Sequence, residues 1–246
     1  TGKYGFRTGV LDTTDALDPS EPSLHEFIEQ YLPSRYRSAV IGKWHLTQGR
    51  RAVDHPAGFG ISHFAGILGG GVEDYENWLL TANGEQTDET TYSTTKLTDL
   101  AIDWIAADAQ PWFMWLAFNA PHTPFHLPPQ ELHERQLENS QEAIEANPRP
   151  YYLAAIEAMD HEIGRLLDSL DDQTRENTLV VFLGVNGSPG QVAIDPYARR
   201  KAKGSLYQGG VNVPFLVSGA GVGMSGGRET ALFNTTDLFA SLAAVN

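Results

Sequence analysis

Apolar positions along the chain follow two periodicities, one typical of buried strands and one typical of amphipathic helices. Short continuous apolar runs predict strands at residues 39–41, 112–118, 178–183 and 213–217. Helical spacing, a Ser-x-x-Glu capping box at Ser23 and a helix cap at Thr236 predict helices at residues 24–31, 92–107, 151–170 and 236–244. Asn83-Gly84, between two polar–apolar runs, indicates a hairpin.

Strands that alternate with helices favour a mostly parallel sheet with helices on both faces. We therefore predict the α/β class, as a three-layer α/β/α domain over residues 1–246. The strand at 112–118 is apolar throughout, so we expect it to be central in the sheet. The polar segment 128–150 is interpreted as a surface excursion rather than a domain boundary.

Composition and charge narrow the classes of partner. The chain has 17 Lys and Arg against 31 Asp and Glu, a net charge of −14, which disfavours binding to nucleic acid and to anionic membranes. Any anion must then be captured by a local cationic pocket. No apolar run approaches the ~20 residues that a membrane-spanning helix needs, so we predict no membrane span. The chain has no cysteine, which excludes disulfides and thiolate metal sites.

The segment Gly42-Lys43-Trp44-His45-Leu46 follows the apolar run at 39–41. Because side chains alternate along a strand, we expect Lys43 and His45 to point the same way and Trp44 the other way. Ligands of open α/β sheets bind beyond the carboxyl ends of strands, and a Lys–His pair suits an anionic group. The alternative is a surface lysine, a packed tryptophan and a histidine with an ordinary hydrogen-bond partner.

Three further residues at strand ends or loops carry chemistry. His122 lies in a proline-rich loop after 112–118 and can donate a proton or bind an anion, or can simply bond a loop carbonyl. Asn186 offers an oxygen that suits Ca²⁺, although a plain Asn-Gly turn is the alternative. Lys203 is a candidate cation or a solvent-exposed lysine. Glycines at 69–71 permit close backbone approach, and a phosphate-cradling loop is less favoured there because no Gly-Lys-Ser/Thr follows.

Together these segments resemble the sulfatases, a family of the alkaline phosphatase superfamily. The matching strings stand in the family's order, and they are IGKWHL at 41–46, AFNAPHTP at 117–124, NTLVVF at 177–182 and KGSLYQGGV at 203–211. The resemblance runs over residues 1–246. It implies an alkaline phosphatase-like fold and hydrolysis of an organic or carbohydrate sulfate ester. In the family a formylglycine attacks sulfur and a Ca²⁺ ion, sometimes Mg²⁺, assists.

Carried over by position, the resemblance implies a role for each candidate residue. Lys43 and Lys203 correspond to the cations that bind sulfate oxygens. His45 corresponds to the partner of the formylglycine hydroxyl, and His122 to the residue that protonates or orients the leaving oxygen. Asn186 corresponds to a metal ligand. Preorganised cations of this kind stabilise the charge that builds on oxygens during ester cleavage. A periplasmic or secreted location is expected for the family, and the chain itself gives no localisation.

The sequence departs from the family at several places. The nucleophile motif Cys/Ser-x-Pro-Ser-Arg and an early Asp-Asp metal pair are missing, and we expect both upstream of Thr1 and a smaller subdomain beyond residue 246. Val185 replaces the Asp of an Asp-Asn metal pair, and Gln208 stands where the family often has Glu. A covalent mechanism needs its nucleophile, so we predict that this chain alone is not a competent sulfatase.

Two alternatives remain open, a phosphoric or phosphonic ester hydrolase of the same superfamily and a non-catalytic anion-binding protein. Because carboxylates are missing, we expect a cationic cluster that depresses the histidine pKa values and binds sulfate or phosphate weakly near Lys43 and Lys203. A sheet that lacks one or two strands should also leave an exposed apolar edge or face, through which the chain can associate.

Overall fold

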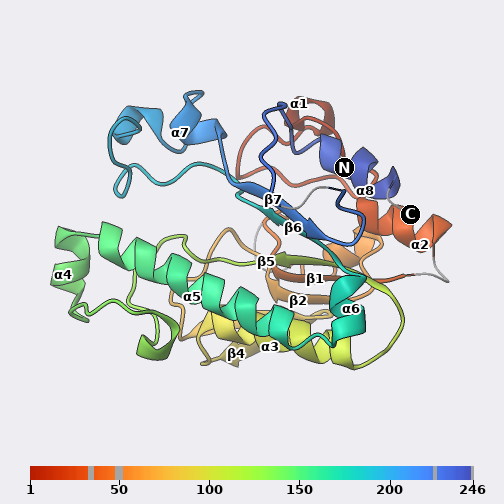
Figure 1. Ribbon diagram of the computed structural model, residues 1–246, viewed down its shortest axis with the longest axis horizontal. Coiled ribbons are helices and arrows are strands. Elements are labelled where there is room, and N and C mark those ends of the chain that lie inside the picture. The colour runs from red at the N-terminus through yellow and green to blue at the C-terminus, as the bar shows by residue number, and fades with distance from the viewer. Residues whose placement is uncertain (33–35, 48–51, 224–225, 245–246) are drawn as a thin grey trace. The chain divides into compact units, whose positions relative to one another are not determined.

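The computed structural model describes residues 1–32, 36–47, 52–223 and 226–244 (Figure 1). Its contacts separate the chain into two compact units. The first comprises Thr1–Pro124 with Ala231–Asn246, and the second comprises Phe125–Thr230. That residues 1–246 form one incomplete domain stays a prediction, and each unit is described here by itself.

The first unit is built on a five-stranded sheet with the order β4-β3-β2-β1-β5 (Figure 1). Its strands are β1 (Arg37–Lys43), β2 (Phe64–Ile67), β3 (Trp78–Ala82), β4 (Glu85–Glu89) and β5 (Trp112–Ala117). Strand β1 pairs in parallel with β2 and β5, whereas β3 is antiparallel to β2 and to β4. Strand β5 therefore lies at the edge of this sheet, and the prediction that it is central is wrong. An apolar run of this kind does not reveal how many strands flank it, and Trp115 within it is exposed.

The helical segments of this unit are α1 (Gly5–Thr8), α2 (Leu24–Tyr31), the 3-10 turn η1 (Pro56–Phe59), α3 (Ser93–Ala106) and α8 (Asp237–Ala244). The predicted capping box is confirmed, since the Ser23 side chain accepts a hydrogen bond from the N–H of Glu26 at 2.8 Å. The predicted hairpin is confirmed as well. Asn83 and Gly84 join β3 to β4 with φ angles of 47° and 91°, the positive values that a tight hairpin turn needs.

Helices α2 and α3 cover opposite faces of the sheet. The Arg37 guanidinium donates to the carbonyl of Trp104, near the end of α3, at 2.6 Å. On the other face, His25 of α2 packs on Phe113 with ring centroids 4.9 Å apart. Phe113 is the register partner of Ser38, which follows Arg37, and consecutive side chains of a strand point to opposite faces. The predicted helix–sheet–helix layering of an α/β protein is confirmed in this unit.

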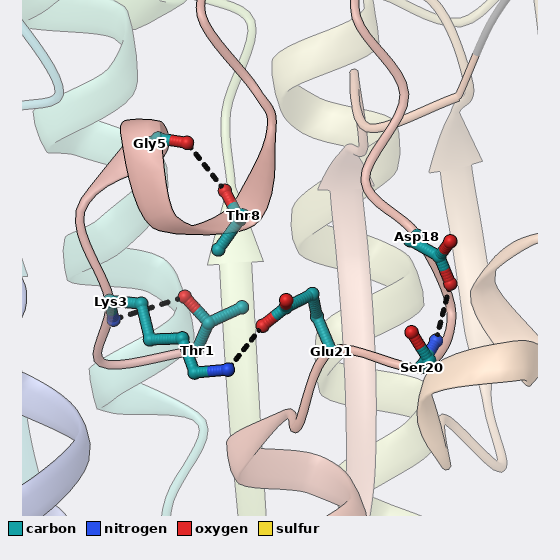
Figure 2. A network of polar contacts seen from close by, with 7 residues as sticks. All are labelled: Thr1, Lys3, Gly5, Thr8, Asp18, Ser20 and Glu21. Atoms are coloured by element: carbon teal, nitrogen blue, oxygen red, sulfur yellow. Dashed lines mark hydrogen bonds and ion pairs between the residues drawn. The ribbon is translucent and has the colours of Figure 1, made fainter.

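One buried cluster of this unit packs against Trp44 and Leu46, which follow β1. It consists of Leu17, Val40, Phe59, Ile61, Phe64 and Leu68. An ion pair connects the N-terminal segment to the chain that precedes α2 (Figure 2). The Lys3 ammonium pairs with the Glu21 carboxylate at 2.7 Å, and the Lys3 main-chain N–H donates to the Thr1 hydroxyl at 3.2 Å.

The second unit contains η2 (Gln130–Leu132), α4 (Gln141–Ala146), α5 (Arg149–Asp168), α6 (Asp172–Glu176), β6 (Leu179–Leu183), η3 (Arg199–Lys201), α7 (Gln208–Val211) and β7 (Phe215–Gly219). Strands β6 and β7 form an antiparallel pair. The predicted helix at 151–170 is confirmed as α5. Its buried residues are Tyr151, Ala154, Ala155, Ala158 and Glu162, whereas its larger aliphatic residues are only half-buried. Among the helices of the described residues, none is both long enough and apolar enough to cross a bilayer.

Candidate functional site

The carboxyl end of β1 carries Lys43 and His45. Strand β1 ends at Lys43, and the chain then continues beside the segment after β2. The Trp44 N–H donates to the carbonyl of Ile67 at 2.8 Å, and the His45 N–H donates to the carbonyl of Leu68 at 3.1 Å. His45 has a φ of 53°, in the left-handed region. Strand alternation therefore stops before His45, so it does not fix the relative direction of the two polar side chains.

Trp44 anchors this segment in the core. Its ring lies against Phe59 and Phe64, with centroids 5.6 and 6.1 Å away. Its indole N–H donates to Nδ1 of His55 at 3.0 Å, which leaves Nε2 of His55 to donate to the Leu17 carbonyl at 3.2 Å. Burial lowers the pKa of His55, and the contact with the Leu17 carbonyl partly opposes this effect. The lowered pKa favours the neutral ring that this hydrogen-bond pattern requires. Trp44 is packed, as the alternative interpretation expected, and this packing fixes the backbone between Lys43 and His45, whose roles stay predictions.

His122 is held by the loop that follows β5. Its N–H donates to the carbonyl of Asn119 at 2.8 Å, and its Nδ1 lies 2.9 Å from the carbonyl oxygen of Thr123. A carbonyl oxygen only accepts, so this contact requires a proton on Nδ1. The buried hydroxyl of Tyr75, whose pKa is raised by burial, donates to the His122 carbonyl at 2.8 Å. The loop-carbonyl alternative is confirmed, and the same bond orients the ring.

Both imidazoles meet the same glycine pair. A Cβ atom added at Gly70 would lie 2.6 Å from Nε2 of His45, and one added at Gly71 would lie 3.5 Å from Nδ1 of His122. The two histidines, which follow different strands, are therefore brought to one place. This place is at the carboxyl ends of the parallel strands β1 and β5, where ligands of such sheets bind.

Lys203 and Asn186 share a second neighbourhood, in the other unit. The Lys203 N–H donates to the Ser188 carbonyl at 3.0 Å, and the Gly187 N–H donates to the Gly210 carbonyl at 3.0 Å. These bonds place the loop after β6 beside the segment 203–211. Both candidate side chains are exposed, and the Asn186 amide nitrogen donates to the Gly187 carbonyl at 2.9 Å. Asn186 therefore takes part in the turn that was the alternative interpretation.

The residues around Asn186 do not by themselves fit a calcium ion. Ca²⁺ takes about six to eight oxygen ligands. Val185 offers none from its side chain, which is 85% exposed. Within residues 1–32, 36–47, 52–223 and 226–244, no three His, Asp or Glu side chains gather as a metal site.

The structure thus brings His45 and His122 together, and separately brings Asn186 near Lys203. The convergence of Lys43, Lys203 and the two histidines on one anion stays a prediction. Sequence reasoning missed Tyr75, whose polar surroundings in the sequence give no sign of its burial. It also gave no role to Asn119, which is 4% exposed and whose amide has no hydrogen-bond partner in the described part of the chain.

Comparisons with known proteins agree on one family. The family model described as Sulfatase matches residues 1–245. The chain is 26% identical over 245 residues to the "Uncharacterized sulfatase YdeN" of Escherichia coli (strain K12), covering 88% of this chain and 42% of that protein. It is 25% identical over 333 residues to an arylsulfatase of Klebsiella aerogenes, covering 98% and 69%. It is also 26% identical over 263 residues to human N-acetylgalactosamine-6-sulfatase, covering 94% and 45%.

A solved structure confirms the predicted fold. The crystal structure of Ps i-CgsB in complex with k-i-k-neocarrahexaose superposes with a TM-score of 0.83 at 24% identity, covering 100% of this chain and 59% of that chain. The chain described here therefore spans between 42% and 69% of the length of the relatives named above.

Proposed function

The chain belongs to the sulfatase family, and we propose that it carries the anion-binding and proton-transfer residues of a sulfuric ester hydrolase. The observation that carries this proposal is the meeting of His45 and His122 at one glycine pair, beyond the carboxyl ends of β1 and β5. The substrate class that we propose is an organic or carbohydrate sulfate ester. The names of its relatives, which include an arylsulfatase and an N-acetylgalactosamine-6-sulfatase, support that class.

In the proposed reaction, the bond between sulfur and the ester oxygen breaks, and the leaving oxygen gains negative charge. His122 suits the role of acid at that oxygen. Its Nδ1 is committed to the Thr123 carbonyl, a contact that stabilises the charged ring, so Nε2 can deliver the proton. Lys43 and Lys203 are proposed to neutralise sulfate oxygens, and His45 to exchange a proton with the attacking group.

We propose Ca²⁺, with Mg²⁺ as the alternative, as the metal of the complete enzyme. Asn186 would contribute one ligand through its amide oxygen. Oxygen ligands beyond those of the described residues are then needed, because Val185 supplies none.

The position of β5 at the end of its sheet supports one further part of the proposal, self-association. Strand β5 is the last strand of its sheet, and Trp115 within it is 43% exposed. An apolar edge of this kind is a template for pairing with another strand. We propose that a second copy of this chain occupies it.

A second candidate function is a non-catalytic anion-binding protein. The specific observation in its favour is the exposed Val185 at the place of a metal-binding carboxylate. A phosphoric ester hydrolase is the third candidate, since two histidines and two lysines accept either tetrahedral anion. Both candidates keep the anion site, so anion binding and turnover must be measured separately.

Titration calorimetry of the 246-residue chain with sulfate and with phosphate tests the anion site. We expect weak binding, competition between the two ions and an approximately tenfold loss of affinity in Lys43→Ala, equivalent to about 1.4 kcal/mol. Lys3→Ala is the matched control, since it removes only an exposed ion pair with Glu21. Absence of heat, or equal affinity in both variants, would contradict the proposal.

Turnover of an aryl sulfate and an aryl phosphate separates the three candidates. The measurement needs a polypeptide that also carries the Cys/Ser-x-Pro-Ser-Arg segment. Preference for the sulfate supports the main proposal, preference for the phosphate supports the third candidate, and binding without turnover of either supports the second.

A further inference from the structure

The residues Gly69, Gly70 and Gly71 form a segment, called here the glycine segment, that follows β2 and Leu68. The hydrogen bond from the His45 N–H to the Leu68 carbonyl, at 3.1 Å, continues the pairing of β1 and β2 beyond the ends of both strands. The register of the sheet therefore determines which residue of the glycine segment faces the ring of His45. That residue is Gly70.

Gly70 leaves room that the imidazole of His45 fills. A Cβ atom at Gly70 would lie 2.6 Å from Nε2, 2.7 Å from Cε1 and 3.1 Å from Cδ2 of that ring. Real Cβ atoms essentially never approach another heavy atom closer than 3.0 Å, so any side chain at position 70 must displace the ring. The crowded atoms belong to the far end of a side chain, which can rotate without moving the sheet.

Gly71 makes a different contact with the second imidazole. A Cβ atom at Gly71 would lie 3.5 Å from Nδ1 and 3.8 Å from Cε1 of His122, which is ordinary van der Waals contact. His122 is also held independently, by the carbonyl of Thr123 and the hydroxyl of Tyr75. The glycine segment therefore constrains the position of His45 and only touches His122.

We propose that Gly70 is a positioning residue, which by lacking a side chain lets the His45 ring lie against the glycine segment next to His122. The importance of that ring position for sulfate binding rests on the proposed function, whereas the position itself does not. A side chain at position 70 turns the ring of His45 away and weakens sulfate binding, while the fold persists.

Histidine NMR signals of the 246-residue chain report on the ring directly. His45→Gln and His122→Gln assign the two Cε1–H resonances. We expect Gly70→Ala to move the His45 resonance and its titration midpoint, with those of His122 nearly unchanged, and to weaken sulfate binding about three- to tenfold. Gly71→Ala should move only the His122 resonance. Gly164→Ala, in helix α5 with nothing within 4 Å of the added Cβ, should move neither.

A double-mutant cycle provides a readout that does not need a well-folded Gly70→Ala protein. We expect Gly70→Ala to lower the free energy of unfolding in the parent chain and to cost much less in a His45→Ala background, where the ring is absent. An equal cost in both backgrounds, or an unchanged His45 resonance in Gly70→Ala, would overturn the proposal. If the parent gives no heat with sulfate, the proposed function loses its anion site, and these two measurements still decide the role of Gly70.

Discussion

One ring nitrogen of His122 is held by a main-chain carbonyl, and the proposed function assigns proton transfer to the other nitrogen. The Thr123 carbonyl holds Nδ1, and the Tyr75 hydroxyl holds the carbonyl of His122 itself. A histidine that has such partners keeps one ring orientation and one tautomer. The loop contact that looked like an alternative to function is therefore compatible with it.

Tyr75→Phe tests how much of that orientation depends on the hydroxyl. We expect a loss of about 1 to 2 kcal/mol in the free energy of unfolding, because a buried carbonyl loses its donor, together with a shift of the His122 NMR resonance. Tyr151→Phe is the matched control, since the Tyr151 hydroxyl donates to the Glu138 carbonyl at 2.7 Å in the other unit. Denaturant unfolding should show similar losses for both variants, and a His122 shift in both would contradict the assignment.

Val185→Asp tests the calcium proposal at the position where a carboxylate is missing. The Val185 side chain is 85% exposed, so the substitution should change the free energy of unfolding by less than about 0.5 kcal/mol. A carboxylate beside Asn186 adds the oxygen ligands that Ca²⁺ prefers. We expect titration calorimetry to show tighter Ca²⁺ binding in the variant than in the parent. Equal affinities would remove position 185 from the metal site.

His25 couples stability to pH. Burial against Phe113 lowers its pKa to about 4. Because the unfolded chain protonates His25 near pH 6.5 and the folded chain keeps it neutral, the full free energy of unfolding is present above that pH. It falls as the pH drops toward 4, by about 2 kcal/mol between about pH 8 and about pH 5. His25→Leu should remove this part of the pH dependence in denaturant titrations, and an unchanged slope would show that His25 is not its source.

The candidate lysines and histidines of the site could be identified from the sequence. Lys43, His45, His122 and Lys203 were recognised because each lies in a string that resembles the sulfatases. The contact of Gly70 with His45 was not predictable, because it depends on the register of β1 against β2. The glycines at 69–71 predicted that another group approaches the backbone closely, but they did not identify that group. Tyr75 and Asn119 were missed because their burial comes from packing between distant segments.

At the scale of elements, the pairing of strand β1 with β5 determines where the site lies. Gly42 has a φ of +111°, and a Cβ there would lie 2.0 Å from the carbonyl oxygen of Ala117 in β5. At this φ a side chain would point into the main chain of β5, so the parallel pairing of β1 with β5 just before Lys43 requires glycine. That pairing places the chain ends that carry His45 and His122 at the same edge of the sheet.

Gly42→Ala should accordingly be among the most damaging substitutions in the chain. The crowded atom belongs to the main chain of β5, and the φ angle is unfavourable for alanine, so we expect a loss of at least about 3 kcal/mol in the free energy of unfolding. Gly164→Ala should instead gain up to about 1 kcal/mol from helix propensity. Comparable thermal midpoints for the two variants would contradict this requirement for glycine at position 42.

The helices and strands were more predictable than their positions in the fold. The spacing of apolar residues identified α2, α3, α5, β5, β6 and β7 within a few residues, because periodicity is a local property of the chain. The position of β5 within its sheet was predicted wrongly, since an apolar run does not reveal how many strands flank it. In α5 the fully buried face consists mainly of alanines, which a search for large apolar residues overlooks.

For the whole molecule, the net charge of −14 and the edge strand β5 have opposite effects on self-association. Two copies of an acidic chain repel at long range, and salt screens that repulsion. Short-range pairing along β5 should therefore strengthen as ionic strength rises. This salt dependence distinguishes strand pairing from association through opposite charges, which salt weakens.

Sedimentation velocity over a range of protein and salt concentrations measures this balance. We expect a concentration-dependent dimer that is favoured by salt. We expect it to be weakened in Trp115→Lys, because a lysine on an edge strand disfavours further pairing. Tyr31→Lys is the control, since it places the same charge at a residue that is 62% exposed in α2 and is not part of the edge strand. A monomer at every concentration would refute the proposed association, and equal weakening by both variants would show that charge, rather than the edge of β5, controls it.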